Sequence, residues 1–281
     1  MVGAGDSPQI SEIVVAALAE DRAAEDATSL ALVPADAMAK GRIVAQSNGV
    51  ISGVECARMA FLACDPDCIQ EWSVGDSDRV VAGQEIMTCS GRARALLAAE
   101  RTALNLLQQL SGVATATAEL VELAAEVQVF DTRKTVVGLR DLQKAAVVHG
   151  GGRNQRRDLD DELLLKENHF ALSDCDYSSA VHQAVSAANG KVVGVEATTA
   201  DQAISALDQG ATYVLLDNFS IEELPQAVAA IRARHPRAVL EASGGIDSLN
   251  IAKLVGSGVN RVSVGAITHS APALDLSFYL E

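Results

Sequence analysis

Hydrophobic residues recur at helical spacing in three stretches of the first part of the chain. The pattern predicts helices at 8–20, 53–63 and 93–124. We expect Ser111 and Gly112 to break the third and longest helix, because glycine interrupts helical patterns. The N-terminal part therefore reads as mainly helical, with strands between the helices.

Strand patterns are of two kinds. A β-branched run at 41–46 and the alternating segment 72–91, punctuated by glycine, predict short strands of an antiparallel type. After residue 125, aliphatic runs alternate with helical stretches, which implies parallel strands joined by right-handed crossovers. These runs lie at 127–134, 162–169, 192–197, 213–218, 238–245 and 261–266. The fold class is therefore α/β, with a barrel of the (β/α) type as the prediction and a doubly wound sheet as the alternative.

Polar residues follow nearly every predicted parallel strand. In barrels of this type the carboxyl ends of the strands carry the functional site. Aliphatic strands rarely all end in charged or polar groups by chance, so the pattern predicts a site at this rim. The residues concerned are Arg133, Lys134, Lys166, Asn168, His169, Glu196, Asp217, Asn218, Glu241, Ser243 and Gly265.

Two late loops are rich in small residues and lead into helical patterns. They read SGGIDSLN at 243–250 and GAITHSAP at 265–272. Backbone N–H groups at such positions bind anions, and barrel enzymes often hold a phosphate after their last strands. The loops therefore favour a phosphate-bearing ligand.

Cationic side chains gather in one short stretch. Eight of the 22 Lys and Arg residues fall between residues 133 and 166, in a chain of net charge −15. Ion pairs with neighbouring carboxylates would explain several of them, and we expect Lys144 and Arg157 to lie on the surface. The others favour a polyanionic ligand, since Arg matches carboxylates and phosphates bidentately.

Composition narrows the class of protein. Hydrophobic residues make up 49% of the chain and aromatic residues only 3%, which is typical of an α/β protein packed by aliphatic side chains. The acidic balance argues against binding to nucleic acids or anionic membranes. No membrane span and no targeting signal are evident, so a cytoplasmic protein is expected. The five cysteines are expected to be reduced, and we read CDPDC at 64–68 as structural rather than zinc-binding.

Together the motifs resemble those of the quinolinate phosphoribosyltransferase family, a type II phosphoribosyltransferase family. The resemblance runs from about residue 10 to the end. It is carried by ERTALNLLQQLSG, DTRKT with GLR, GGGRN, LLLKENH, LLDN, LEASGGI and VSVGAITHSAPALDLS. It implies an N-terminal α/β domain, 1–112, completed by the tail 271–281, and a domain at 113–270 that forms an open, incomplete (β/α) barrel of six to seven parallel strands. It also implies a homodimer in which each N-terminal domain covers the partner's barrel.

The resemblance further implies a reaction and an acceptor site. Quinolinate, 5-phosphoribosyl pyrophosphate (PRPP) and Mg²⁺ would give nicotinate mononucleotide, pyrophosphate and CO₂. Arg133, Arg156 and Lys166 would face the two carboxylates of the acceptor, and Gln155 would lie beside them. Arg101 would enter from the neighbouring subunit. Lys166 is also the candidate acid that protonates the ring after CO₂ leaves.

A donor site is implied in the same way. Lys134 would contact PRPP, and Glu196 and Asp217 would serve the ribose hydroxyls and Mg²⁺. His269 is either near the phosphate or bonded at a helix start. The 5′-phosphate would be held by Ser243, Gly244, Gly245 and Gly265.

The chain departs from the family pattern at three positions. Gln155 stands where a histidine is usual, Val137 where a proline is usual, and Gly194 where a glutamate is usual. Because two of these changes fall near the expected acceptor site, a related transferase acting on another aromatic carboxylate remains an alternative. A Schiff-base aldolase using Lys166 and a non-catalytic binder of a phosphorylated ligand are two further alternatives.

Overall fold

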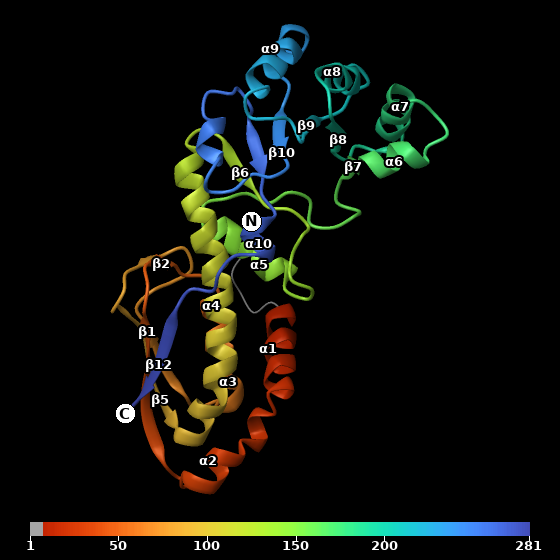
Figure 1. Cartoon of the computed structure of the whole chain (residues 1–281). Helices are drawn as coiled ribbons and strands as arrows, with labels where there is room; N and C mark the ends of the chain where they lie inside the picture. Colours follow the sequence, from red (N-terminus) through yellow and green to blue (C-terminus); the bar gives the residue numbers. More distant parts are fainter. Residues whose placement is uncertain (1–7) are drawn as a thin grey trace. The chain divides into compact units, whose positions relative to one another are not determined.

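The computed structural model describes residues 8–281, and its contacts divide the chain into two compact units. The N-terminal unit comprises the chain up to residue 116 together with 137–150 and 271–281. The barrel unit comprises 117–136 and 151–270. Each unit has its own sheet (Figure 1).

A four-stranded antiparallel sheet forms the centre of the N-terminal unit, in the order β12–β1–β5–β3. Its strands are β1 (Met38–Ala45), β3 (Ile69–Trp72), β5 (Glu85–Arg92) and β12 (Leu276–Leu280), and β2 (Gly49–Val50) pairs separately with β4 (Arg79–Val80). The helices are α1 (Pro8–Glu20), η1 (Ala23–Glu25), α2 (Ala27–Leu32), α3 (Val54–Cys64), α4 (Ala93–Ala124) and α5 (Arg140–His149).

Helices cover one face of this sheet. Phe61 of α3 meets Phe278 of β12 with ring centroids 5.5 Å apart. Gln108 of α4 donates a 2.7 Å hydrogen bond to the carbonyl of Leu276 in β12. Both contacts join helices from the first half of the chain to its last strand, which therefore belongs to the core of this unit.

The expected break in the third helix is wrong, since α4 runs unbroken from Ala93 to Ala124. A Cβ on Gly112 would lie 2.1 Å from the carbonyl oxygen of Pro272, so only glycine allows this close approach. Ser111 accepts a 3.0 Å hydrogen bond from the backbone N–H of Ser52. The two residues are thus there for close packing and not for a change of direction.

A six-stranded parallel sheet forms the barrel unit, in the order β6–β11–β10–β9–β8–β7. Its strands are β6 (Gln128–Phe130), β7 (Leu163–Leu165), β8 (Val193–Ala197), β9 (Tyr213–Asp217), β10 (Leu240–Ser243) and β11 (Arg261–Ser263). The first strand of this unit, β6, pairs with the last, β11. The two edge strands of the sheet are β6 and β7, which do not pair with each other. This confirms the predicted open barrel.

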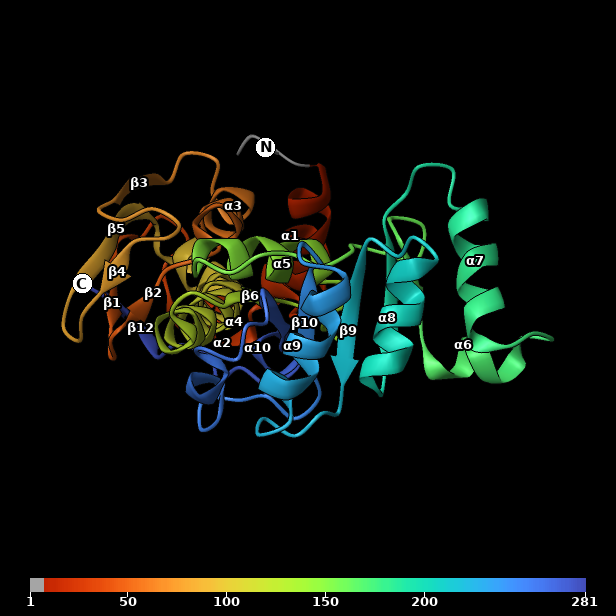
Figure 2. The same cartoon turned by 90° about the horizontal axis from the view of Figure 1, so that it is seen from above.

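Helices follow the strands of this sheet and form the crossovers. Asp176 and Thr199 cap the helices after β7 and β8, each accepting a backbone N–H of the first turn. Figure 2 shows α8 beside β9, and α8 contacts both β8 and β9. The helices are α6 (Glu167–Leu172), α7 (Tyr177–Ala187), α8 (Ala200–Asp208), α9 (Leu224–Arg234), η2 (Ile251–Leu254) and α10 (Ala266–His269).

Within residues 8–281, none of the helices has the length and apolar character needed to cross a membrane.

Candidate functional site

One face of the six-stranded sheet carries the polar residues at the strand ends. Glu196 lies opposite Leu215, and Asp217, two residues further along β9, lies opposite Ser243 of β10. Because side chains alternate along a strand, these residues project to the same side. We call this side, which also carries Tyr213 and Leu215, the inner face.

Lys166 and Glu196 form an ion pair on the inner face. Lys166 follows β7 directly and caps α6, and its backbone N–H donates to Nδ1 of His169 at 2.9 Å. The hydroxyl of Tyr177 donates to the carbonyl of Glu196 at 3.0 Å. Burial, and then the nearby Glu196 carboxylate, raise the pKa of Tyr177, so this hydroxyl stays a donor. An ammonium group is therefore fixed at this strand end.

Asp217 and Ser243 meet at the ends of β9 and β10. Asn218 donates to the Asp217 carboxylate at 3.0 Å, and its backbone N–H donates to the carbonyl of Ser243 at 3.0 Å. A Cβ on Gly244 would lie 2.3 Å from Oδ1 of Asn218, and Gly244 has a φ of +98°. Glycine is therefore required at residue 244 for two reasons: there is no room for a Cβ, and the positive φ disfavours other residues.

The loop after β10 is closed by a contact within it and leaves space beside Gly245. Gly245 has a positive φ, and a Cβ there would meet nothing within 4 Å. Asn250 donates to the Gly245 carbonyl at 2.8 Å and thereby closes the loop.

Lys134, Gly265 and His269 come together at the ends of β6 and β11. A Cβ on Gly265 would lie 3.1 Å from Cδ of Lys134 and 3.2 Å from Nε2 of His269. Thr268 ties the two loops, donating to the carbonyl of Lys134 at 2.8 Å. Lys134 and His269, two residues predicted for the donor site, thus lie next to Gly265, a third residue predicted for it.

Arg156 is a buried cation with few protein partners. Its exposed fraction is 8%, and its Nη1 donates to the carbonyl of Glu162 at 3.3 Å. Its Nε has no hydrogen-bond partner within the described part of the chain. The preceding residue, Gln155, is half-buried and donates from Nε2 to the carboxylate of Glu241 at 3.0 Å. A buried guanidinium with a vacant donor favours an anionic ligand.

Arg101 and Arg133 are the other two arginines that the resemblance assigns to the acceptor. Arg101 belongs to the N-terminal unit, on α4, where its side chain is 58% exposed and forms a 3.6 Å ion pair with Glu100. Arg133 follows β6 and is half-buried.

Two sequence predictions are corrected. Glu241 does not lie at the rim, because it is the second residue of β10 and is completely buried. Lys144 was expected on the surface but is buried on α5. Arg157 is exposed, as expected, and pairs with Asp158 at 3.1 Å.

Three polar residues on the inner face were not predicted. They are Glu162, Tyr213 and Arg261, and they contact one another and Glu241. Their sequence signal is faint, since each is a lone polar or aromatic residue at the start of an aliphatic strand.

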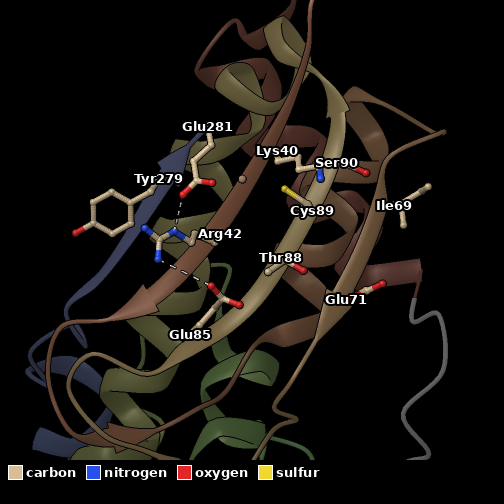
Figure 3. Close-up of a pocket in the computed structure, with 11 residues that line it drawn as sticks. Lys40, Arg42, Ile69, Glu71, Glu85, Thr88, Cys89, Ser90, Tyr279 and Glu281 are labelled. Atoms are coloured by element: carbon tan, nitrogen blue, oxygen red, sulfur yellow. Dashed lines mark ion pairs between the residues drawn. The ribbon is translucent and has the colours of Figure 1, made fainter.

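Two other polar features lie in the N-terminal unit. A hollow of about 460 Å³ on the N-terminal sheet contains Arg42 between Glu85 and Glu281 (Figure 3), and shares no residue with the predicted site.

The second feature is a contact between a serine, a histidine and an aspartate. Ser52 lies 2.8 Å from Nδ1 of His149, and Asp76 lies 4.0 Å from the same nitrogen. A nucleophilic triad needs its serine and its carboxylate on opposite ring nitrogens, so this contact is structural.

Comparison with known proteins gives the family. Residues 26–111 match "Quinolinate phosphoribosyl transferase, N-terminal domain", and residues 113–279 match the C-terminal domain of the same family. A nicotinate-nucleotide pyrophosphorylase of Mycobacterium leprae is 39% identical over 272 residues, with 94% of each chain covered. A quinolinate phosphoribosyltransferase of Nicotiana tabacum is 32% identical, with 97% of this chain and 82% of the relative covered.

Solved structures agree with the sequence relatives. NadC from Streptococcus pyogenes superposes with a TM-score of 0.92 at 36% identity, with 99% of both chains covered. A nicotinate-nucleotide pyrophosphorylase from Francisella tularensis gives a TM-score of 0.90 at 36% identity, with 98% of this chain and 96% of that one covered. The resemblance seen in the motifs is thereby confirmed, and the chain belongs to the quinolinate phosphoribosyl transferase family.

Proposed function

We propose that this enzyme transfers the phosphoribosyl group of PRPP to the ring nitrogen of quinolinate and releases pyrophosphate and CO₂. Relatives covering nearly the whole chain carry this activity in their names. The observation that supports it most directly is Arg156, a buried guanidinium whose Nε has no hydrogen-bond partner among residues 8–281.

The acceptor is a dianion, which explains the need for such a cation. A carboxylate accepts two parallel N–H bonds from a guanidinium, so an acceptor carboxylate would complete the hydrogen bonds of Arg156. We assign the acceptor's carboxylates to Arg156, Arg133 and the Lys166 ammonium. Gln155, uncharged at every pH, contributes a hydrogen bond rather than an ion pair.

The donor site follows from the late loops. Lys134 and His269 flank Gly265, and the Gly244–Gly245 turn exposes backbone next to Ser243. We assign the 5′-phosphate of PRPP to this turn and to Gly265, and the pyrophosphate to Lys134. The absence of Cβ atoms at the glycines allows phosphate oxygens to approach the backbone.

We expect Mg²⁺ to be bound jointly by protein carboxylates and by the phosphate oxygens of the substrate. Among residues 8–281 there is no group of three His, Cys, Asp or Glu side chains that could hold a metal ion. Mg²⁺, however, commonly takes one or two carboxylates and completes its shell with water and phosphate oxygens. Glu196 and Asp217, which project from neighbouring strands to one side, would supply these carboxylates. When bound, the ion neutralises charge on the leaving pyrophosphate.

The chemistry is mainly electrostatic placement. The ring nitrogen forms a bond to C1′ as the C1′–O bond to pyrophosphate breaks, and the leaving group takes that electron pair. The bond from C2 of the ring to its carboxylate then breaks, and CO₂ leaves. The electron pair left on C2 takes a proton, for which we assign the Lys166 ammonium as donor. Its pairing with Glu196 disfavours the aldolase alternative, because an ion-paired ammonium is not a nucleophile.

We also propose that the enzyme works as a homodimer in which Arg101 completes the partner's acceptor site. Its exposed guanidinium on α4 supports this. Coexpression of Arg101→Ala and Lys166→Ala chains tests it, because mixed dimers contain one site with both native residues. Activity above that of either variant alone is expected, and none above it would refute the exchange.

Turnover assays test the proposed reaction. With PRPP and Mg²⁺, we expect pyrophosphate and CO₂ in equal amounts from quinolinate, and little pyrophosphate from nicotinate, which lacks the second carboxylate. Pyrophosphate release with another pyridine carboxylate but not with quinolinate would favour the related transferase. Binding without any pyrophosphate release would favour a non-catalytic protein.

A further inference from the structure

A group of polar side chains lies on the inner face beneath the proposed acceptor residues. Tyr213 starts β9, Glu241 lies in β10 and Arg261 starts β11, and the register of the three strands places them on one side. Glu162 immediately precedes β7. We call these four residues the inner network. The donor and acceptor roles proposed above use none of them.

Tyr213 joins two members of the inner network. Its hydroxyl donates to Oε1 of Glu162 at 2.6 Å, and its ring lies 4.0 Å from the guanidinium carbon of Arg261. Phe130 of β6 faces the same guanidinium at 4.7 Å. Two aromatic rings thus fix the plane of Arg261. Burial raises the pKa of Tyr213 well above its usual value, so the hydroxyl remains a donor at every working pH.

Arg261 connects this side of the network to Glu241. Its Nε lies 2.7 Å from Oε2 of Glu241, a carboxylate with no exposed surface. The other oxygen of Glu241 accepts the hydrogen bond from Nε2 of Gln155. Gln155 is held at its backbone as well, since its N–H donates to Asp131 at 2.8 Å. The carboxamide of Gln155 is therefore oriented by Glu241.

Glu162 connects the network to Arg156. The carbonyl of Glu162 accepts from Nη1 of Arg156, while its carboxylate accepts from Tyr213. One residue thus carries both the bond to Tyr213 and the bond to the buried guanidinium. Displacing the Glu162 side chain would also shift the carbonyl on which Arg156 rests.

We propose that the inner network is a positioning device for Gln155 and Arg156, and hence a determinant of acceptor binding. Glu241 orients Gln155, Glu162 orients Arg156, and Tyr213 with Arg261 couples the two. This inference rests on the proposed function only in assigning Gln155 and Arg156 to the acceptor. It predicts that the network acts on the acceptor and not on PRPP.

Charge supports a positioning role over simple packing. The network with Arg156 contains two carboxylates and two guanidiniums, which balance one another in a buried region. Apolar side chains would fill the same space at a smaller desolvation cost. A set of buried ionic groups that ends on two ligand-facing residues is consistent with a requirement for fixed orientation.

Tyr213→Phe is the sharpest test, because it removes one hydroxyl and keeps the ring beneath Arg261. We expect the KM for quinolinate to rise about tenfold, as for loss of a hydrogen bond to a charged group, while the KM for PRPP stays within about twofold. Tyr279→Phe is the matched control, since its hydroxyl bonds Gln46 in the N-terminal unit. That variant should keep both KM values.

Glu162→Ala, which removes the oxygen that accepts from Tyr213, and its double variant with Tyr213→Phe test the coupling. If Tyr213 acts through Glu162, the two changes in acceptor KM will not multiply in the double variant. Melting curves show whether each variant is folded. If Tyr213→Phe is unstable, Arg261→Lys, which keeps the charge but loses the planar stacking, is measured in the same way.

The outcomes separate this inference from the proposed function. Pyrophosphate release by the wild-type enzyme tests the proposed function. The ratio of the acceptor KM of the variant to that of the wild type tests the role of the inner network. Quinolinate dissociation constants from calorimetry give that ratio even where turnover is absent. A folded Tyr213→Phe protein with unchanged acceptor KM and dissociation constant would overturn the inference, as would an equal rise in the KM for PRPP.

Discussion

Gly194 and Tyr213 occupy one space on neighbouring strands. A Cβ on Gly194 would lie 2.3 Å from Cζ of Tyr213 and 2.5 Å from its hydroxyl. The two residues are directly opposite each other in β8 and β9. The departure from the family pattern at Gly194 therefore has a physical reason, since the tyrosine fills the volume that any side chain at 194 would need.

Gly194→Ala should destabilise the barrel unit by about 1–3 kcal/mol, because the added methyl group must displace the Tyr213 ring from a close-packed position. Melting temperatures measure the effect. Gly75→Ala is the control, since a Cβ there would meet only a side-chain atom at 3.8 Å. The double variant Gly194→Ala with Tyr213→Leu should recover part of the loss. Equal stability of wild type and Gly194→Ala would show that the ring moves at no cost.

Gly112→Ala should also destabilise, although alanine favours helix formation over glycine by about 1 kcal/mol. Residue 112 lies within the unbroken helix α4, and its Cβ would meet the backbone of Pro272 at 2.1 Å. Because a backbone atom cannot swing aside, we expect the clash to outweigh the helix propensity. Denaturant or thermal unfolding checks the sign. A more stable variant would mean that the loop at Pro272 yields easily.

These two glycines show where sequence reasoning reached its limit. Periodicity predicted the helix of α4 and the strand of β8, because both depend on which residues of one segment share a face. It could not give the reason for Gly112 or Gly194, because each glycine is required by a residue far away in the chain. Glycine alone indicated a helix break, and the structure shows a packing contact instead.

The candidate site also contains residues whose positions could be predicted from the sequence and contacts that could not. The strand-end rule predicted where Lys166, Glu196 and Asp217 would lie, since parallel strands bring their carboxyl ends to one edge. The rule failed for Glu241, which sits within its strand. The contact between Tyr213 and Glu162 was not predictable either, because it depends on which side chain meets which across strands, and local patterns carry no information about that.

Thiol chemistry should distinguish one cysteine from the others. Cys175 is exposed, whereas burial raises the pKa of the other four thiols, to about 12 for Cys56 and Cys89, and Cys64 is the least buried of the four. Only thiolates react with disulfide reagents, and at pH 8 the thiols of Cys56 and Cys89 are ionised on the order of one part in ten thousand. A thiol assay on native protein should therefore show one fast group per chain, absent from Cys175→Ser. Fast reaction of several thiols in that variant would contradict the burial.

Arg156→Ala should raise the KM for the acceptor on the order of a hundredfold, the loss expected when one partner of a buried, charge-assisted pair is removed. Arg157→Ala is a matched control, because the neighbouring side chain is 60% exposed and pairs with Asp158. It should leave the acceptor KM within about twofold. Initial rates at varied quinolinate concentration measure both. Similar values for the two variants would mean that Arg156 does not bind the acceptor.

Glu162 should make the stability of the protein fall with rising pH. Burial raises the pKa of its carboxyl above 4.5, against the opposing influence of Tyr213, Arg261 and Arg156 and with a small further rise from Asp161. The folded state therefore holds this proton more tightly than the unfolded state. The resulting stability is complete below about pH 4.5 and is lost as the pH rises through the raised pKa.

Glu162→Gln removes this titration and keeps an oxygen that can accept from Tyr213. Relative to wild type, its melting temperature should therefore improve as the pH rises from 4.5 through the raised pKa of Glu162. Glu222→Gln, at an exposed position, should track wild type over the same range. Glu241 is another buried carboxyl whose pKa burial raises, with a further rise from Glu162, so replacing Glu162 also lessens this second shift and acts on stability in the same direction. A difference between Glu162→Gln and wild type that stays constant with pH would mean that Glu162 titrates alike in the folded and unfolded chain.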